Sequence, residues 1–548
     1  MPSLPPEADI IIVGAGTAGC VLAARLSEDP DLRVLVVEAG RADRSPWIHI
    51  PVGFSRLLDD AGLNWCYETE SQSDLAGRTV RWPRGKVVGG SSAINGMVWV
   101  RGAPHDYDRW AATVGDSAWS WTEAEALFRM CEAAPSDADA RLGRDGRMPL
   151  ARPRHDHPLV RAFIEAGVDA GLAERRDLGI SDHVGVGPYL TTIRRGIRVS
   201  AAGAYLKPAL RRDNLELATA STVCGVTLDS GHRAVGVRLT RLGTPVLGTP
   251  ALVRARRGVV LAAGAVDTPK LLMLSGVGSG PDLARLGIPV AVQSPEVGRN
   301  LQDHFGVRVI AEVGRPITIN DDFRRPWRLV GHALRYAVAR TGPLAMGGAY
   351  AGAFFASDGG DRPDMQIHFL PLSSERRGWT FHRFSGVTAN VCQLRPASRG
   401  RIGLGSADPA APPCIDPGYL SDERDRKSIV AGLRFTRELF RHPPFSTRYG
   451  AEERMPGERC ASDAALLDYA RSTGSTVFHP VGTCRMGRHD GVVDSSFRVR
   501  GTRNLWVADA SVMPHLPSGN TNAATMMLAE RAARVLKQAI APPRGTTP

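Results

Sequence analysis

The stretch from Ala8 to Gly40 limits what this chain can fold into more than any other part of the sequence. It contains an apolar run of strand length at 10–13, three glycines in G-x-G-x-x-G spacing, and an apolar segment at 21–26 typical of a helix. A second apolar run at 34–37 ends at Glu38. A strand, a glycine turn, a helix and a second strand that ends in an acid form the βαβ unit of dinucleotide-binding proteins.

Each part of this unit has a physical role in binding a dinucleotide. Gly14 permits the tight turn, Gly16 lets the backbone approach a pyrophosphate, and Gly19 lets the helix pack closely on the strand. The helix N-terminus offers free N–H groups and the positive end of its dipole to the phosphates. Glu38 is placed to accept hydrogen bonds from a ribose. The unit alone does not distinguish NAD from FAD.

Length, charge and cysteine usage narrow the class of protein. The chain has 548 residues, enough for several domain-sized units. Its net charge of +12 comes mostly from scattered arginines, so we expect no nucleic-acid partner. The eight cysteines are spread widely without a C-x-x-C pair or a cluster with histidine, which is typical of a cytoplasmic enzyme with reduced thiols and no metal site. We find no signal-peptide pattern and no apolar run as long as the ~18 residues of a membrane span, so only peripheral association with a membrane stays open.

A second segment, from Arg84 to Gly96, is unusually rich in small residues. Six small residues and Asn95 fall within the eight positions 89–96, and apolar residues follow directly. Glycine and serine at this density favour a backbone that lies against a flat ligand, with Asn95 as a polar contact.

Further segments predict the surrounding elements. The run at 258–264 is a buried strand that ends in glycine and precedes a helix at 265–275, a junction typical of a loop that faces a cofactor in a doubly wound sheet. Helical spacing occurs at 106–130 and 422–441, and the chain closes with a strand at 504–508 and a helix at 523–540. Residues 307–394 are less patterned, and we place most of a substrate-facing region there.

Taken together, these segments resemble the glucose-methanol-choline (GMC) family of FAD-dependent oxidoreductases, in particular its choline-dehydrogenase-like bacterial branch. The resemblance covers essentially the whole chain, and it is carried by motifs at 84–92, 264–278, 298–304, 478–487 and 509–522. It implies an α/β fold with a Rossmann-like FAD-binding domain built from discontinuous segments, and an α+β substrate-binding domain with an antiparallel sheet.

The resemblance also implies a domain organisation. Residues 1–306 would form mainly the FAD-binding domain, with parts of about 110–190 contributing to the substrate side. Residues 307–470 would form mainly the substrate-binding domain. Residues 471–548 would return to the FAD domain and supply active-site residues.

The cofactor implied by the resemblance is FAD. In some relatives a histidine just before the signature asparagine bonds covalently to the flavin, whereas this chain has Ile94 there, so we expect non-covalent binding. By motif, the expected FAD contacts are Gly14, Gly16, Thr17, Ala18, Gly19, Glu38, Ala39, Trp65, Arg84, Gly89, Gly90, Ser91, Asn95, Gly96, Val223, Asp509, Ala510, Asn520 and Thr521.

The implied reaction is oxidation of an alcohol to the aldehyde by hydride transfer to flavin N5. An alcohol is too weak an acid to ionise alone at neutral pH, so the site needs a general base. His479 in the motif at 478–487 is the candidate base, and Asn522 is the expected second active-site residue, bonded to the substrate oxygen. His304 is interpreted as structural or as a support for FAD.

The substrate is expected to be a primary, non-ionic alcohol. Relatives that oxidise choline place a glutamate in the segment that corresponds to 347–352, where this chain has Tyr350 and no acid. A quaternary ammonium group needs a carboxylate or an aromatic cage. The alternatives are a true choline dehydrogenase, and a non-oxidative flavoenzyme of the same fold that resembles hydroxynitrile lyase or fatty-acid photodecarboxylase. A dehydrogenase is favoured over an oxidase, while the electron acceptor (oxygen, a quinone or another carrier) and the oligomeric state stay open.

Overall fold

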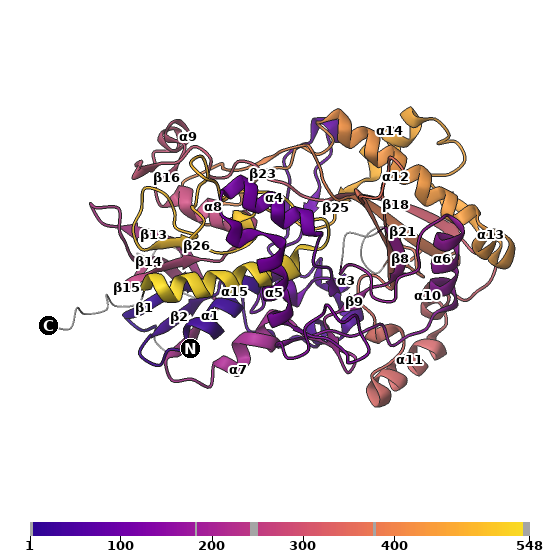
Figure 1. Cartoon of the computed structure of the whole chain (residues 1–548), viewed down its shortest axis with the longest axis horizontal. Coiled ribbons are helices and arrows are strands. Elements are labelled where there is room, and N and C mark those ends of the chain that lie inside the picture. The colour runs from indigo at the N-terminus through magenta and orange to yellow at the C-terminus, as the bar shows by residue number, and fades with distance from the viewer. Residues whose placement is uncertain (1–3, 181–183, 242–249, 376–379, 541–548) are drawn as a thin grey trace.

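Two sheets organise the chain, one on the left of Figure 1 and one on the right. The computed structural model describes residues 4–180, 184–241, 250–375 and 380–540. The predicted domain segments 1–306 and 471–548 therefore include residues 1–3 and 541–548, which lie outside the described residues.

The first sheet is built around the predicted βαβ unit. Its strands follow the order β12–β2–β1–β15–β14–β13, and β26 adds beside β15. Strands β12, β2, β1, β15 and β26 run parallel, whereas β13 and β14 join antiparallel at one side. The bounds are β1 Glu7–Val13, β2 Val34–Val37, β12 Leu215–Ala218, β13 Ser221–Leu228, β14 Ala234–Arg241, β15 Ala251–Leu261 and β26 Leu505–Val507.

Close packing of helices on this sheet explains the apolar strand sequences. Every residue of β1 after Glu7 and every residue of β2 is buried, as expected for parallel strands covered on both faces. Helices α1 (Thr17–Leu26) and α15 (Thr521–Ile540) pack against each other beside β1 and β2. A Cβ atom at Gly19 would lie 1.9 Å from the carbonyl oxygen of Gly14, so only glycine allows α1 to approach this closely.

The second sheet is antiparallel. Its order is β24–β18–β21–β20–β19–β8, and the short β25 pairs with β18. The bounds are β8 Gly185–Pro188, β18 Phe305–Glu312, β19 Ala351–Phe355, β20 Met365–Leu370, β21 Gly386–Gln393, β24 Glu452–Met455 and β25 Ser475–Thr476.

The two faces of this sheet differ. In β20, Met365, Ile367 and Phe369 are buried in an apolar core beneath α6 (Pro158–Asp169) and α12 (Glu423–Arg441). The alternating residues His368 and Leu370 line a cavity on the other face, because successive side chains of a strand point to opposite sides.

The mixed α/β fold predicted from the sequence is confirmed, with two differences in detail. The helical stretch predicted at 106–130 is two helices, α4 (Pro104–Val114) and α5 (Trp121–Cys131), because Gly115 adopts φ 73° and ends α4. The weakly patterned region at 307–394 contains the strands β18 to β21 as well as α10 (Ile319–Phe323) and α11 (Pro326–Ala339). Across the residues that the structure describes, we find no helix long and apolar enough to cross a membrane.

Candidate active site

A cavity of about 1600 Å³ lies between the two sheets. Typical small-molecule sites have about 300–1,000 Å³, so this one has room for a large ligand. One end is lined by the carboxyl ends of β1 and β2 and by the junction of β15 with α8 (Gly264–Leu274). Strands β18, β20 and β21 line the other end. The first end is the position outside parallel strands where α/β sheets bind ligands.

The glycine turn presents bare backbone to this cavity. Gly14 adopts φ 101°, and a Cβ atom there would lie 2.6 Å from the carbonyl oxygen of Ala262. At Gly16 the nearest atom to a Cβ position is 3.9 Å away, so this residue borders open space. No side chain caps the N-terminus of α1, which leaves its first N–H groups for a ligand.

Glu38 connects the glycine turn to the loop after β2. Its carboxylate accepts hydrogen bonds from the backbone N–H groups of Ala15 and Gly40, both at 2.8 Å. Burial raises the pKa of Glu38 to about 7, although both backbone bonds act to lower it. A carboxyl group held at the end of β2 in this way can also face a ribose, and it lines the cavity together with Ala39 and Val223.

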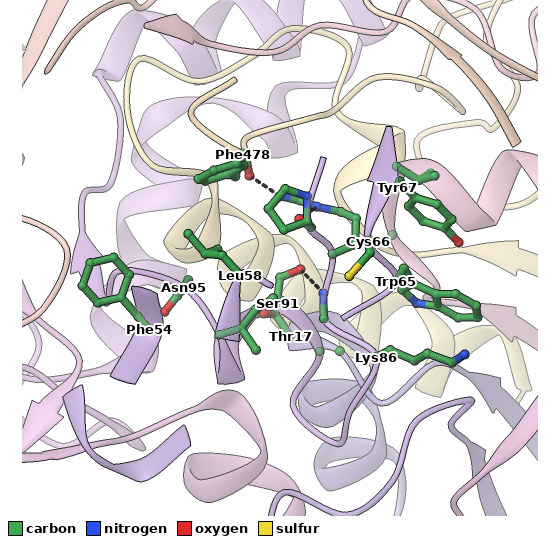
Figure 2. Close-up of a pocket in the computed structure, with 18 of the residues that line it drawn as sticks. Thr17, Phe54, Leu58, Trp65, Cys66, Tyr67, Lys86, Ser91, Asn95 and Phe478 are labelled. Carbon is green, nitrogen blue, oxygen red and sulfur yellow. Dashed lines mark hydrogen bonds between the residues drawn. The ribbon is translucent and has the colours of Figure 1, made fainter. Parts of the chain in front are cut away.

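The small-residue segment lies against the glycine turn. Gly89 donates from its backbone N–H to the carbonyl oxygen of Ala15 at 2.8 Å, and a Cβ atom at Gly90 would lie 2.7 Å from Cα of Gly16. Figure 2 shows Thr17, Ser91 and Asn95 around one space, and Ser91 Oγ accepts from the backbone N–H of Gly85 at 3.2 Å. Two backbone segments without large side chains thus form one wall.

His479 lines the same cavity, and only 8% of its surface is exposed. Its Nδ1 is 2.9 Å from Nδ1 of His304, and its Nε2 is 3.1 Å from Nδ2 of Asn520. The pairing of β25 with β18 brings the two histidines together, because His304 precedes β18 and His479 follows β25.

The first of two hydrogen-bond chains fixes the protonation of His479 from the side of Nδ1. Burial lowers the pKa of His304 to about 3, so this ring is neutral near pH 7. Its Nε2 is 3.1 Å from the carbonyl oxygen of Leu394, which can only accept, so Nε2 of His304 carries the proton. Nδ1 of His304 is then an acceptor, and Nδ1 of His479 must donate to it.

The second chain reaches His479 from the side of Nε2. Tyr189 donates from its hydroxyl to the carbonyl oxygen of Ile367 at 2.9 Å, and it accepts from Nε2 of Gln366 at 3.0 Å. The same amide nitrogen is 3.3 Å from Oδ1 of Asn520, so Nδ2 of Asn520 faces His479 and donates to it. Both chains therefore leave Nε2 of His479 without a proton, in the form that a general base needs.

The loop that carries His479 is held in a strained conformation. Phe478 adopts φ 71°, which is costly for an aromatic residue and is found mainly where neighbours enforce it. Arg84 donates to the carbonyl oxygen of Phe478 at 2.8 Å, visible as a dashed line at Phe478 in Figure 2. Asp303 accepts from the backbone N–H of His479 at 2.8 Å and from Oγ1 of Thr476 at 2.5 Å.

The two asparagines of the C-terminal motif have different partners within the chain. The sequence predicted that Asn522 hydrogen-bonds the substrate oxygen near His479 and that Asn520 contacts the cofactor. In the structure Asn520 contacts His479, while Oδ1 of Asn522 accepts from Oγ1 of Thr17 at 2.8 Å. The reason is geometric: Asn520 lies in the loop before α15, whereas Asn522 is in its first turn and faces the start of α1.

The structure brings nearly all predicted site residues to this cavity. Gly19 and Gly89 are the two that do not line it, since both serve packing of the glycine turn. Asp509 lines it but directs its carboxylate to the backbone N–H groups of Gly264 and Ser511, both at 2.8 Å. The lining residues among those predicted are Gly14, Gly16, Thr17, Ala18, Glu38, Ala39, Trp65, Arg84, Gly90, Ser91, Asn95, Gly96, Val223, His479, Asp509, Ala510, Asn520, Thr521 and Asn522.

Sequence reasoning did not find the positioning residues around His479. Asp303 and His304 lie in the motif at 298–304, so a motif signal existed for them, but not for a contact with His479. Gln366 and Tyr189 carry no motif, and only the register of the second sheet reveals them.

Aromatic and aliphatic side chains form part of the cavity wall. They include Phe54, Leu58, Phe323, Tyr350, Leu370 and Phe381. The α10 carboxylate that lines the cavity, Asp322, is already paired with Arg328 at 3.0 Å and with His332 at 2.9 Å. A cationic ligand would therefore have aromatic faces, but not a free Asp322 carboxylate, to hold it.

Comparison with known proteins identifies relatives of the same overall length. Two family models described as GMC oxidoreductase match this chain. The model of the N-terminal part matches residues 8–306, and the model of the C-terminal part matches residues 396–529. Alcohol dehydrogenase (acceptor) of Pseudomonas putida is 41% identical, over 96% of this chain and 95% of that protein. Mitochondrial choline dehydrogenase of Homo sapiens is 40% identical, over 97% of this chain and 90% of that protein.

Solved structures agree with these relatives. Pyridoxine 4-oxidase from Mesorbium loti has a TM-score of 0.86 at 33% identity, over 96% of this chain and 99% of that one. Formate oxidase from Aspergillus oryzae RIB40, a protein with FAD, has a TM-score of 0.90 at 27% identity, over 98% of this chain and 99% of that one.

The residues of this chain fit FAD. The bare turn at Gly16 and the uncapped N-terminus of α1 suit a pyrophosphate, and the cavity continues past the small-residue wall to His479. The predicted cofactor is thus confirmed by the relatives and is compatible with the shape and donors of the cavity.

Replacing Gly16 by valine should separate cofactor binding from folding. Gly16 adopts φ −73°, which valine also tolerates, and the nearest atom to its Cβ position is 3.9 Å away, so the protein should fold. The side chain would occupy the space of the pyrophosphate. We expect a folded protein with almost no flavin, measured as flavin absorbance per mole of protein beside a thermal melt. Gly331→Val, at an exposed glycine with no atom within 4 Å of its Cβ position, is the matched control. A fully flavinated Gly16→Val protein would refute this interpretation of the turn.

Proposed function

The chain belongs to the GMC oxidoreductase family and is an FAD-dependent oxidoreductase that acts on CH–OH donors, and we propose that its substrate is a primary, non-ionic alcohol that it oxidises to the aldehyde. The observation that carries this proposal is the pair of partners of His479 in the cavity wall: its Nδ1 faces Nδ1 of His304 and its Nε2 faces Nδ2 of Asn520, which makes Nε2 the ring nitrogen without a proton.

Alcohol oxidation divides between the cofactor and the chain. When bound, FAD supplies the hydride acceptor. The chain must accept the hydroxyl proton, hold the oxygen in place and exclude water. Nε2 of His479 accepts the proton, and the ring becomes an imidazolium that keeps its Nδ1 bond to His304. A positioned base of this kind contributes about 10²–10⁴-fold in rate.

Asn520 is the residue that we propose to orient the substrate oxygen beside His479. Its Nδ2 lies 3.1 Å from Nε2 of His479, so a substrate hydroxyl that replaces the amide as the partner of Nε2 would lie beside Nδ2 and could accept a hydrogen bond from it. Asn522, which bonds to Thr17 at the start of α1, is proposed instead to support the cofactor. This assignment reverses the roles expected from the sequence.

The charges that line the cavity support a non-ionic alcohol over choline. A quaternary ammonium group is held by a free carboxylate or by an aromatic cage. The carboxylate of Asp322 is already paired with Arg328 and His332, and the half-buried Arg308 adds a positive charge to the lining. Tyr350 is buried in the segment 347–352, where the family resemblance implies a glutamate in relatives that oxidise choline. The similar proteins include an alcohol dehydrogenase and choline dehydrogenases, so the names of the relatives do not by themselves choose between the two substrates.

We propose that FAD binds without a covalent bond to the chain. Ile94 is buried against the cavity beside the signature Asn95, and its side chain has no nucleophile. Release of free FAD on acid precipitation supports this proposal, and flavin that stays in the pellet contradicts it.

Replacing His479 by alanine should abolish turnover while FAD stays bound. The expected loss in kcat is at least the ~10²-fold that a general base contributes. His489→Ala, at an exposed histidine, is the matched control and should keep full activity. Near-normal turnover of the His479→Ala protein with its flavin bound would exclude His479 as the base.

The two asparagines should behave differently when replaced. Asn520→Ala removes the donor beside Nε2 of His479, so we expect kcat to fall about 10-fold or more with normal flavin content. Asn522→Ala removes the bond to Thr17, so we expect weaker FAD retention as the main effect. Steady-state kinetics and flavin content of both purified proteins measure the difference. The opposite pattern would restore the roles expected from the sequence.

Anaerobic reduction of the bound flavin tests the proposed substrate class. We expect primary aliphatic or aromatic alcohols to bleach the flavin absorbance faster than choline at equal concentration, because the carboxylate of Asp322 is already paired and would not offset the charge of choline. Faster bleaching by choline would establish a choline dehydrogenase. The absence of bleaching by any alcohol, with FAD bound, would contradict alcohol oxidation itself.

A further inference from the structure

Helix α11 exposes an apolar face that the protein does not cover. The exposed fractions are 69% for Trp327, 59% for Val330, 61% for Leu334 and 87% for Val338. Spacings of three and four residues place these side chains on one side of the helix, which we call the α11 outer face. Figure 1 shows α11 projecting at the lower right edge of the molecule. A contiguous exposed apolar patch of this kind usually marks an interaction surface.

The opposite side of α11 is fixed to the protein. The hydroxyl of Tyr336 donates to the carbonyl oxygen of Gly196 at 3.0 Å, and His332 is 2.9 Å from the carboxylate of Asp322. Leu329, His332 and Ala333 contribute to the wall of the large cavity. The helix is therefore a rigid part of the structure, and its outer face is presented in a defined direction.

Arginines border the α11 outer face. Arg328 and Arg335 lie on one flank of the helix, and Arg325 and Arg340 lie at its two ends. Within the described part of the chain, neither Arg335 nor Arg340 has a carboxylate partner: Arg335 donates to Oγ1 of Thr341 at 3.0 Å, and Arg340 lies 4.8 Å from the ring centre of Tyr336.

A neighbouring hairpin adds to this positive border. Strands β10 (Ile193–Arg194) and β11 (Ile197–Arg198) form the hairpin, whose Gly196 contacts the C-terminal end of α11. Arg194 and Arg195 in this hairpin are exposed, and Ile197 beside them is 37% exposed. The apolar face and the positive charges thus occur at the same edge of the molecule.

We propose that the α11 outer face docks on the surface of a lipid bilayer that contains anionic lipids. An amphipathic helix with a tryptophan, aliphatic residues and flanking arginines lies in the plane of the interface, with its apolar side in the acyl boundary and its arginines at the headgroups. Each basic residue near an anionic surface adds attraction. A second copy of the chain fits this face less well, because it would bring arginine against arginine between two proteins of net charge +12.

Docking by α11 would also place one wall of the cavity at the bilayer. Residues 329, 332 and 333 line the cavity from the inner side of the same helix. An apolar alcohol dissolved in the membrane would then reach the site without crossing bulk water. This consequence rests on the proposed function, whereas docking itself does not.

Flotation of the full-length holoenzyme with vesicles tests the proposal. We expect binding to vesicles of phosphatidylglycerol mixed with phosphatidylcholine, weaker binding to phosphatidylcholine alone, and a decrease as salt is raised. The double variant Trp327→Ser with Leu334→Ser should bind at least about 10-fold more weakly, because it removes two large side chains from the lipid. The matched control is Leu252→Ser, at a leucine with 46% exposure elsewhere on the surface, and it should bind as the unmodified protein does.

Three outcomes would overturn the proposal. The first is no flotation of the holoenzyme with the anionic vesicles. The second is flotation that the double variant retains in full. The third is a dimer, seen by light scattering without lipid, that the double variant abolishes, since this would assign the α11 outer face to a second copy. Flavin content and anaerobic reduction by the best alcohol, measured on the double variant, verify that it is folded and separate failure of docking from failure of the proposed function.

Discussion

The contact on which the site depends is the hydrogen bond between two buried histidines, His304 and His479. A histidine can act as a base only through a nitrogen without a proton, and the partner of its other nitrogen decides which one that is. Here the partner is a neutral ring whose own proton points at the carbonyl oxygen of Leu394. From the other side, the amide of Asn520 is oriented by Gln366, which Tyr189 orients in turn. Two chains of hydrogen bonds, one ending at the carbonyl oxygen of Leu394 and one at that of Ile367, thus determine that Nε2 of His479 carries a lone pair and no proton.

This arrangement requires both sheets. The first sheet supplies the bare glycine turn, the helix N-terminus and Glu38 at one end of the cavity. The second sheet supplies Gln366 and the carbonyl group of Ile367, and it places His304 directly before β18 and Leu394 directly after β21. Arg84 connects the two parts of the site. It belongs to the small-residue segment beside the glycine turn, and it donates a hydrogen bond to the carbonyl oxygen of Phe478, whose backbone is strained. Cofactor binding and proton transfer are therefore parts of one packed structure.

The sequence was sufficient where function depends on local spacing. The βαβ unit, the strand and helix around Gly264, and the C-terminal helix agree closely with β1, α1, β2, α8 and α15 because their signals are short-range periods and glycine turns. The site around His479 was predicted less completely. Asn520 and Asn522 are two residues apart, and only the start of α15 determines that the first faces His479 and the second faces Thr17. Gln366 and Tyr189 act through strand register, which a single sequence does not encode in any local pattern.

The tautomer of His479 is the most direct test of this account. Selective ¹⁵N labelling of histidine in the oxidised holoenzyme, with His479→Gln to assign the signal, measures by NMR which ring nitrogen carries the proton. The structure predicts a protonated Nδ1 and an unprotonated Nε2 for His479, together with a protonated Nε2 for His304. A signal from His479 with a protonated Nε2 and a bare Nδ1 would contradict the account, because the nitrogen that faces the substrate could then not accept its proton.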